Sequence, residues 1–273
     1  MRLDECTQSD ALCIDLIRRE LDTHDVGFQT LLYQEVDSTV GALRALAEVG
    51  APEGTVVLAE AQRAGRGRTG QPWFSPPGVN VHAAVLFRPR IARDAVPVFA
   101  LVAPLAVCDA IRAQGVAAAT RWPNDVLIEG RKVGAGMAAS ATTGARVEYV
   151  ILAVGVNLNV TREALREALG AAADSVTSVH EAAGRPIDRN VFTAAFLNLL
   201  EKWVDIYRTD GPTAVLGAWR ARDALVGRRV VVRSTAEIAR GLALGVNVHG
   251  ELVLETAPGV VRAIPDGQAE TEA

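Results

Sequence analysis

The sequence predicts an α+β protein with a large domain over residues 1–225, built on a mixed β-sheet, and a small β-barrel over residues 226–273. Strand-like and helix-like segments alternate through the larger part of the chain. After Gly227 the pattern changes to short apolar strands separated by glycines, which is typical of a small antiparallel barrel. The 273 residues, 49% hydrophobic and 22% charged, are sufficient for one large and one small core.

The large domain is expected to begin with a short helix over residues 8–23, whose apolar face comprises Leu12, Leu16, Ile17 and Leu21. Three later segments have the composition and length of strands: 30–36, 55–61 and 80–87. Ser38 or Thr39 is a suitable N-cap for a helix that ends at Val49, because Gly50 follows where a C-terminal glycine is favoured.

The next elements are a long helix and two hairpins. Residues 96–114 predict a buried apolar helix, and Glu129-Gly130 predicts the turn of a hairpin over 128–133. A second hairpin is expected to join 136–141 to 146–154. An amphipathic helix is expected over 189–208, with an inward face made by Phe192, Phe196, Leu199, Leu200 and Trp203. We expect the helices to cover one face of the sheet.

The barrel is expected to contain four short strands, at residues 230–234, 239–246, 251–256 and 260–264. The last eight residues, 266–273, are polar, and we expect them to be a frayed tail.

The net charge and the N-terminal residues limit the possible functions and cellular locations. A net charge of −4 and a pI near 5.7 argue against a general nucleic-acid binder. The first residues include acids and no apolar segment, and no 18-residue apolar stretch lacks a charge or a proline, so neither a signal peptide nor a membrane span is expected. The three cysteines form no CxxC pair, which predicts free thiols. Together these observations predict a cytoplasmic location. Before the first strand there is also too little chain for a helix-turn-helix module, so no DNA binding is expected.

Three segments have compositions that suit chemistry on anions. The first is the loop from Gln62 to Gly70, with the sequence QRAGRGRTG, followed by Trp73. Its glycines let backbone N–H groups approach an anion, and its arginines supply forked donors for carboxylate or phosphate. The alternative is a solvated basic loop or an RNA-type arginine–glycine segment.

The second segment is Arg121-Trp-Pro-Asn-Asp125, and the third is the stretch GRKVGAG from Gly130 to Gly136. Asp125 is a candidate Mg²⁺ ligand on phosphate, and Asn124 could orient an oxygen of the ligand. Lys132 stands beside small residues and could reach over a bound molecule. The alternatives are an ordinary turn for the second segment and a solvated basic pair on a hairpin for the third.

The three segments, with Asp37-Ser38-Thr39 before them and GVNLN (155–159) after them, resemble in order and spacing the biotin–protein ligase family. The resemblance runs from about residue 33 to about residue 265. It implies a catalytic domain of the biotin/lipoate ligase type with an SH3-like C-terminal barrel, in the monofunctional form without an N-terminal DNA-binding domain. It also implies the activity of a biotin–[acetyl-CoA-carboxylase] ligase, which forms biotinyl-5′-AMP from biotin and ATP with Mg²⁺. Biotin would then pass to a lysine of a biotin carboxyl carrier domain.

The resemblance also implies residue roles. Biotin would be bound by Ser38, Thr39, Gln62, Gly65, Arg66, Gly67, Arg68, Lys132 and Gly134. ATP and the adenylate would be bound by Arg66, Arg68, Trp73, Asn124, Asp125, Lys132 and Asn157. The catalytic groups would be Lys132, Arg68 and Asp125, of which Asp125 would also hold the metal.

The chain departs from the family pattern at four positions. Val40 stands where asparagine is usual, Thr69 replaces a frequent arginine, and Arg121 replaces the usual lysine. Ala135 stands where glycine is usual, so the register of residues 134–136 is left open.

Other functions stay open at this point. A lipoate–protein ligase shares the fold class, but its RRxSGGG-like loop is absent. A biotin-sensing regulator without enzyme activity, or an RNA-binding module, is a further alternative. A monomer and a homodimer are both compatible with the sequence.

Overall fold

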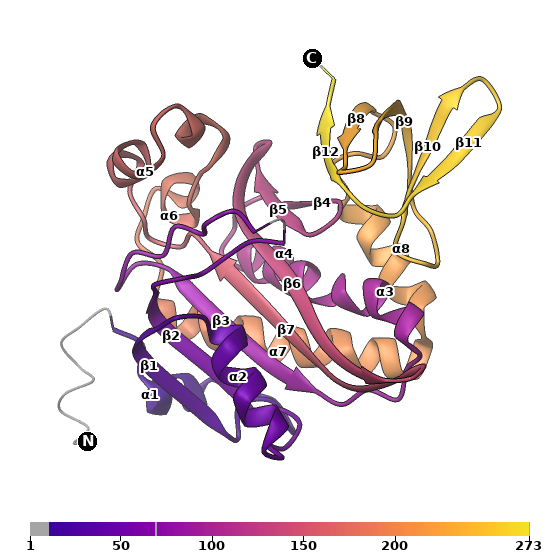
Figure 1. Ribbon diagram of the computed structural model, residues 1–273. Coiled ribbons are helices and arrows are strands. Elements are labelled where there is room, and N and C mark those ends of the chain that lie inside the picture. The colour runs from indigo at the N-terminus through magenta and orange to yellow at the C-terminus, as the bar shows by residue number, and fades with distance from the viewer. Residues whose placement is uncertain (1–10, 69, 273) are drawn as a thin grey trace.

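The computed structural model describes residues 11–68 and 70–272, and its main feature is a seven-stranded mixed sheet (Figure 1). The strand order is β1-β2-β3-β7-β6-β5-β4, in which β1 and β2 are parallel and the other neighbours antiparallel. The strands are β1 (Thr30–Val36), β2 (Val56–Gln62), β3 (Val81–Phe87), β4 (Ala119–Arg121), β5 (Asp125–Ile128), β6 (Arg131–Thr143) and β7 (Arg146–Val156). The strands predicted at 30–36, 55–61 and 80–87 and both hairpins are confirmed.

The two faces of the sheet are covered by different helices. Along β3, Ala83 and Val85 belong to the core shared with α4 (Val102–Ala113) and α7 (Arg189–Asp210), whereas Ala84 and Leu86 belong to a second core with α2 (Thr39–Glu48). Successive side chains of a strand point to opposite faces, so α2 lies across the sheet from α4 and α7. The prediction that helices cover one face is therefore wrong for α2. Ser38 is its N-cap, as expected.

The predicted long helix over 96–114 is divided into α3 (Val96–Ala100) and α4, and the short helix η2 (Arg93–Ala95) precedes it. Residues 93–113 are long and apolar enough to cross a bilayer. However, 67% of their most apolar 18-residue stretch is buried inside the fold, as in the core helix of a globular protein. The first helix, α1 (Ile14–Arg19), is shorter than predicted, and residues 8–10 of that prediction lie outside the described residues. The remaining helices are α5 (Arg162–Leu169), η3 (Gly170–Ser175), α6 (Val179–Ala183) and α8 (Pro212–Arg222).

The C-terminal part forms a second, antiparallel sheet with the order β11-β10-β9-β8-β12. Its strands are β8 (Arg229–Arg233), β9 (Ile238–Val246), β10 (Leu252–Ala257), β11 (Val260–Ile264) and β12 (Gln268–Thr271). The predicted frayed tail is wrong for 268–271, because β12 pairs with β8 and buries Ala269. The two sheets touch where Trp122 Nε1 donates to the Gly250 carbonyl over 2.9 Å. The division at residue 225 stays a prediction.

The cysteine prediction is partly wrong. Cys108 is a free, buried thiol on α4, as expected. Cys13 is disulfide-bonded, which a chain with an odd number of cysteines and no CxxC pair did not suggest.

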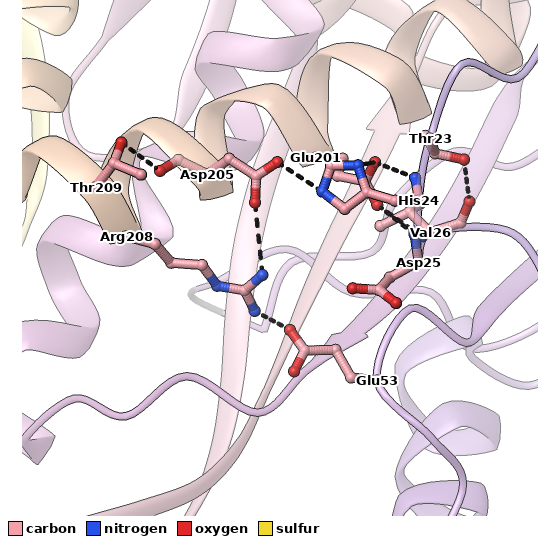
Figure 2. Close-up of polar contacts among 9 residues, drawn as sticks. All are labelled: Thr23, His24, Asp25, Val26, Glu53, Glu201, Asp205, Arg208 and Thr209. Atoms are coloured by element: carbon pink, nitrogen blue, oxygen red, sulfur yellow. Dashed lines mark hydrogen bonds and ion pairs between the residues drawn. The ribbon is translucent and has the colours of Figure 1, made fainter.

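A buried carboxylate of α7 accepts several hydrogen bonds from the segment before β1 (Figure 2). Glu201 accepts hydrogen bonds from the backbone N–H groups of His24, Asp25 and Val26 over 2.7, 2.9 and 2.8 Å. The His24 ring lies between Glu201 and Asp205, with nitrogen–oxygen distances of 3.3 and 3.0 Å. The Glu201 side chain is 5% exposed, its bond from the Val26 N–H is buried, and those from His24 and Asp25 are partly buried.

Glu201→Ala is expected to lower the free energy of unfolding by about 3 kcal/mol, because buried N–H groups would lose their acceptor. Asp205→Asn on the same helix is the control and should cost less than about 1 kcal/mol, since it removes partly exposed ion pairs. Urea unfolding of both variants measures the difference. Equal losses would contradict the role of Glu201.

Asp223 lies at the junction of the two sheets, and burial raises the pKa of its carboxyl to about 6, from 3.8. The unfolded chain therefore ionises Asp223 near pH 4, while the folded chain holds the proton until about pH 6. The free energy of unfolding should fall across this interval by up to about 3 kcal/mol, because the unfolded state releases the proton first. Asp223→Asn should be as stable as the wild type at pH 3.5 and more stable at pH 7. Urea unfolding at both pH values checks this, and a constant difference would contradict it.

Candidate active site

Two adjoining cavities lie at the edge of the sheet where β1, β2 and β7 end. The first has a volume of about 240 Å³ and is lined by Ser38, Thr39, Val40, Gln62, Ala64, Arg66, Gly67, Arg68, Trp73, Asn124, Ala135, Gly136, Met137, Ala153, Val154 and Gly155. The second has a volume of about 210 Å³ and is lined by Gly67, Arg68, Gln71, Pro72, Trp73, Phe74, Asn124, Lys132, Ala135, Asn157, Leu165, Leu169, Ala172, Ser175, Val176 and Gln268. The two linings share Gly67, Arg68, Trp73, Asn124 and Ala135.

One end of the first cavity is made by the turn between β1 and α2. The parallel register places Val36 opposite Gln62, so the turn after β1 meets the end of β2. Gln62 Oε1 accepts from the Thr39 backbone N–H over 2.9 Å and from the Thr39 hydroxyl over 3.2 Å. These bonds fix the orientation of the Gln62 amide and leave its NH₂ group as the donor for a ligand.

The loop after β2 folds back on itself above the cavities. Gly67 N–H donates to the Gln71 carbonyl over 2.8 Å, and Trp73 N–H donates to the Gly65 carbonyl over 2.9 Å. Arg66 Nη1 donates to the Gly70 carbonyl over 2.8 Å. These bonds close the loop and place its arginines beside the cavities.

Below the loop, the buried carboxylate of Asp125 is shared by two cations. Its Oδ2 lies 2.7 Å from Arg121 Nη2, and its Oδ1 lies 2.6 Å from Lys132 Nζ. The Lys132 ammonium also lies 5.4 Å from the centre of the Trp73 ring. Lys132 is therefore held at the wall between the two cavities. Arg121, noted in the sequence only as a departure from the family pattern, has a defined role as a partner of Asp125.

Trp73 forms that wall because β7 has a glycine beneath it. A Cβ atom on Gly155 would lie 2.7 Å from the indole Nε1 and Cε2 atoms. Gly155 pairs with Ala135 across the sheet, so the two small residues leave room for the ring. Trp73 Nε1 is buried and has no hydrogen-bond partner in the described part of the chain.

Two asparagines complete the site, and the structure fixes each of them. Asn124 Nδ2 donates to the Gly136 carbonyl over 2.7 Å. Asn157 is buried and donates from Nδ2 to the Thr177 carbonyl over 3.2 Å, so its amide is held at the floor of the second cavity.

Most residues named from the sequence come together here. Those lining the cavities are Ser38, Thr39, Gln62, Arg66, Gly67, Arg68, Trp73, Asn124, Lys132 and Asn157. Gly65, Asp125 and Gly134 lie outside both linings. The register of 134–136 is now defined: Ala135 lines both cavities, whereas a Cβ on Gly134 would lie 3.0 Å from the Gly155 carbonyl.

Sequence reasoning missed the apolar walls. In the first cavity they include Val40 and Met137, and in the second they are Phe74, Leu165, Leu169 and Val176. The repeat REALREAL over 162–169 has the spacing of an amphipathic helix and could have indicated the second wall.

The described residues do not fit a direct Mg²⁺ site at Asp125. Both of its oxygens are taken by ion pairs, and neither cavity is lined by another carboxylate. Magnesium prefers one or two carboxylates together with water and phosphate oxygens. The expectation that Asp125 holds the metal does not agree with this geometry.

Comparisons with known proteins agree with this geometry. Residues 34–157 match the model of the Biotin/lipoate A/B protein ligase family. The chain is 35% identical over 246 residues to the bifunctional ligase/repressor BirA of Bacillus spizizenii, covering 89% of this chain and 74% of that protein. It is 34% identical over 206 residues to the biotin–[acetyl-CoA-carboxylase] ligase of Paracoccus denitrificans, covering 74% and 85%. The fold is similar to that of the biotin protein ligase from Aquifex aeolicus in complex with biotin and ATP, with a TM-score of 0.74, 21% identity, and coverage of 90% and 99%.

The fold is that of the biotin and lipoate ligases, and residues 34–157 match the model of that family. Within that class, the sequence matches to the Bacillus spizizenii and Paracoccus denitrificans proteins are long enough and similar enough to assign a family. The chain belongs to the biotin–protein ligase family.

Gly155→Ala is expected to displace the Trp73 ring, because the new Cβ would overlap it. The cost in stability should be about 1 kcal/mol, since Trp73 is on a loop that can shift. The tryptophan emission should change, and the change should vanish in a Trp73→Phe background. Gly217→Ala on α8, where a Cβ meets nothing within 4 Å, is the control. An unchanged spectrum in Gly155→Ala would show that Trp73 does not pack on Gly155.

Proposed function

We propose that this protein joins biotin to ATP, giving biotinyl-5′-AMP and pyrophosphate, and then transfers biotin to a lysine of a biotin carboxyl carrier domain. The proposal rests mainly on the charges around the junction of the two cavities. Arg66, Arg68 and Lys132 line them, and no carboxylate lines either one in the described chain. Two anions that repel each other can meet at such a junction, because fixed cations offset their charge.

The first cavity suits a molecule that is largely apolar and has one amide-like head. Val40, Met137 and Ala153 supply apolar surface, and Thr39 and Gln62 supply fixed polar groups at the far end. Biotin has such a polar head and apolar body: a ureido group, an apolar chain and, at the far end, a carboxylate. Its head would lie at Gln62 and its carboxylate at the junction with the second cavity. The roles of Ser38 and of the glycines 65 and 67 are proposed on the same basis.

The second cavity suits the adenosine part of ATP. Phe74, Leu165 and Leu169 form apolar walls for a flat base, and Asn157 provides a fixed amide. The α-phosphate would then face the biotin carboxylate across Trp73, near Lys132 and Arg68. The structure of the similar Aquifex aeolicus protein is a complex with biotin and ATP, which supports the choice of these two substrates.

In the first step, a carboxylate oxygen of biotin forms a bond to the α-phosphorus, and the bond to the pyrophosphate oxygen breaks. In the second step, the lysine amine attacks the acyl carbon, AMP leaves, and the amine loses a proton. The arginines and Lys132 offset the negative charge on the phosphate during both steps. The loop above the cavities would protect the mixed anhydride from water. The name of the Paracoccus denitrificans relative supports a carboxylase as the source of the carrier domain.

Lys132→Ala is expected to reduce biotin-dependent pyrophosphate release by about 10²–10³-fold, the usual effect of removing one donor from a charge-stabilising site. Lys202→Ala, the only other lysine in the sequence, is the matched control and should keep wild-type rates. Labelling of a carrier domain, detected with streptavidin, tests the second step. A wild-type rate in a folded Lys132→Ala variant would contradict the assignment, and labelling with lipoate in place of biotin would contradict the substrate.

A further inference from the structure

Within the described residues, Arg68 ties the loop above the cavities to the C-terminal sheet. Its Nη1 donates to the Asp266 carboxylate in a close ion pair, and its Nη2 donates to the Gly267 carbonyl over 2.6 Å. These residues are 198 and 199 positions away in sequence. Arg68 thus attaches the loop to the second sheet through two hydrogen bonds.

The acceptor side of this contact is rigid. Gly267 has a φ of +141°, and a Cβ there would lie 2.8 Å from Val232 Cγ1 and 2.9 Å from the Arg233 carbonyl. The turn is packed against β8 and continues directly into β12, which pairs with β8. Asp266 also accepts from the Gly267 N–H over 2.8 Å. The carboxylate and the carbonyl therefore stand at fixed positions when they receive Arg68.

The contact leaves Arg68 able to bind a ligand. A guanidinium has five N–H donors, and two of them face Asp266 and Gly267. The other three have no hydrogen-bond partner within the described ranges, and Arg68 lines both cavities in this position. The hydrogen bond from Arg68 lowers the pKa of the Asp266 carboxyl, so the pair stays ionised at neutral pH. Gln268, the next residue of the same turn, lines the second cavity.

We infer that Asp266 is a positioning residue: with the Gly267 carbonyl it holds Arg68 over the junction of the cavities, so that the C-terminal sheet keeps the loop closed on the acyl-adenylate. The inference rests on the proposed function. A substrate does not have to displace Asp266, because the guanidinium can bind the turn and an anion at the same time. Loss of Asp266 would release the loop and the position of Arg68, while removing no side chain that touches the substrates.

The test is pyrophosphate release by the full chain with biotin and ATP in the absence of an acceptor. A wild-type enzyme that retains its adenylate should release about one pyrophosphate for each active site and then slow down. Asp266→Asn should keep the first turnover within about two-fold, but release pyrophosphate about ten-fold faster afterwards as free adenylate escapes. Asp266→Glu, which keeps the charge, should recover most of the retention. Glu237→Gln is the control, since it breaks the comparable Glu237–Arg262 pair of 2.8 Å elsewhere in the same sheet.

A double-mutant cycle of Asp266→Asn and Arg68→Ala distinguishes positioning of Arg68 by Asp266 from a general structural effect of the Asp266 substitution. If Asp266 acts through Arg68, Asp266→Asn should add less than about two-fold to the leakage of Arg68→Ala. An additive effect, or wild-type leakage in Asp266→Asn, would overturn the inference. If Asp266→Asn does not fold, Asp266→Ser, which keeps a turn-forming side chain, takes its place in the cycle. A wild-type protein without biotin-dependent pyrophosphate release would instead reject the proposed function.

Discussion

The shared carboxylate of Asp125 is the interaction on which the site depends. A carboxylate with 7% of its side chain exposed is costly to bury alone, and the ion pairs to Arg121 and Lys132 compensate for that cost. The pairs also fix Lys132 against Trp73, which in turn requires glycine at position 155. One buried charge therefore determines where the cation, the aromatic wall and both cavities lie.

The topology of the sheet explains why these parts meet. β1 and β2 are parallel, so the turn to α2 and the arginine loop leave the sheet at the same edge. β7 pairs with both β3 and β6, which places Gly155 beside Ala135 under that loop. α2 covers only part of its face of the sheet among the described residues, and the first cavity lies on the part beside it. The helix whose face of the sheet the sequence did not predict thus borders the first cavity, while α5 (Arg162–Leu169) borders the second.

Local patterns predicted the elements whose signals are local. The bounds of β1, β2 and β3 agree to within one residue, and Glu129 and Gly130 have the positive φ values, 50° and 77°, that their hairpin turn requires. β12 was missed because its residues are polar and its strand conformation depends on pairing with β8. The motif order identified the residues that line the cavities, because their chemistry is visible in the sequence. It could not reveal their partners: the contact of Arg68 with the C-terminal turn joins residues nearly 200 positions apart.

The two cations at the junction are held in different ways, and this difference has a physical consequence. Lys132 pairs with a buried acid on a neighbouring strand of the same sheet, so its position is as rigid as the sheet itself. Arg68 is on a loop, and its acid partner is on the other sheet, with 58% of the Asp266 side chain exposed. An exposed ion pair contributes little stability and can open without unfolding either sheet. The proposed function requires a site that admits two substrates and protects a reactive intermediate. One cation of each kind suits this requirement, because a rigid Arg68 would block entry and a mobile Lys132 would lose the alignment of the reacting groups.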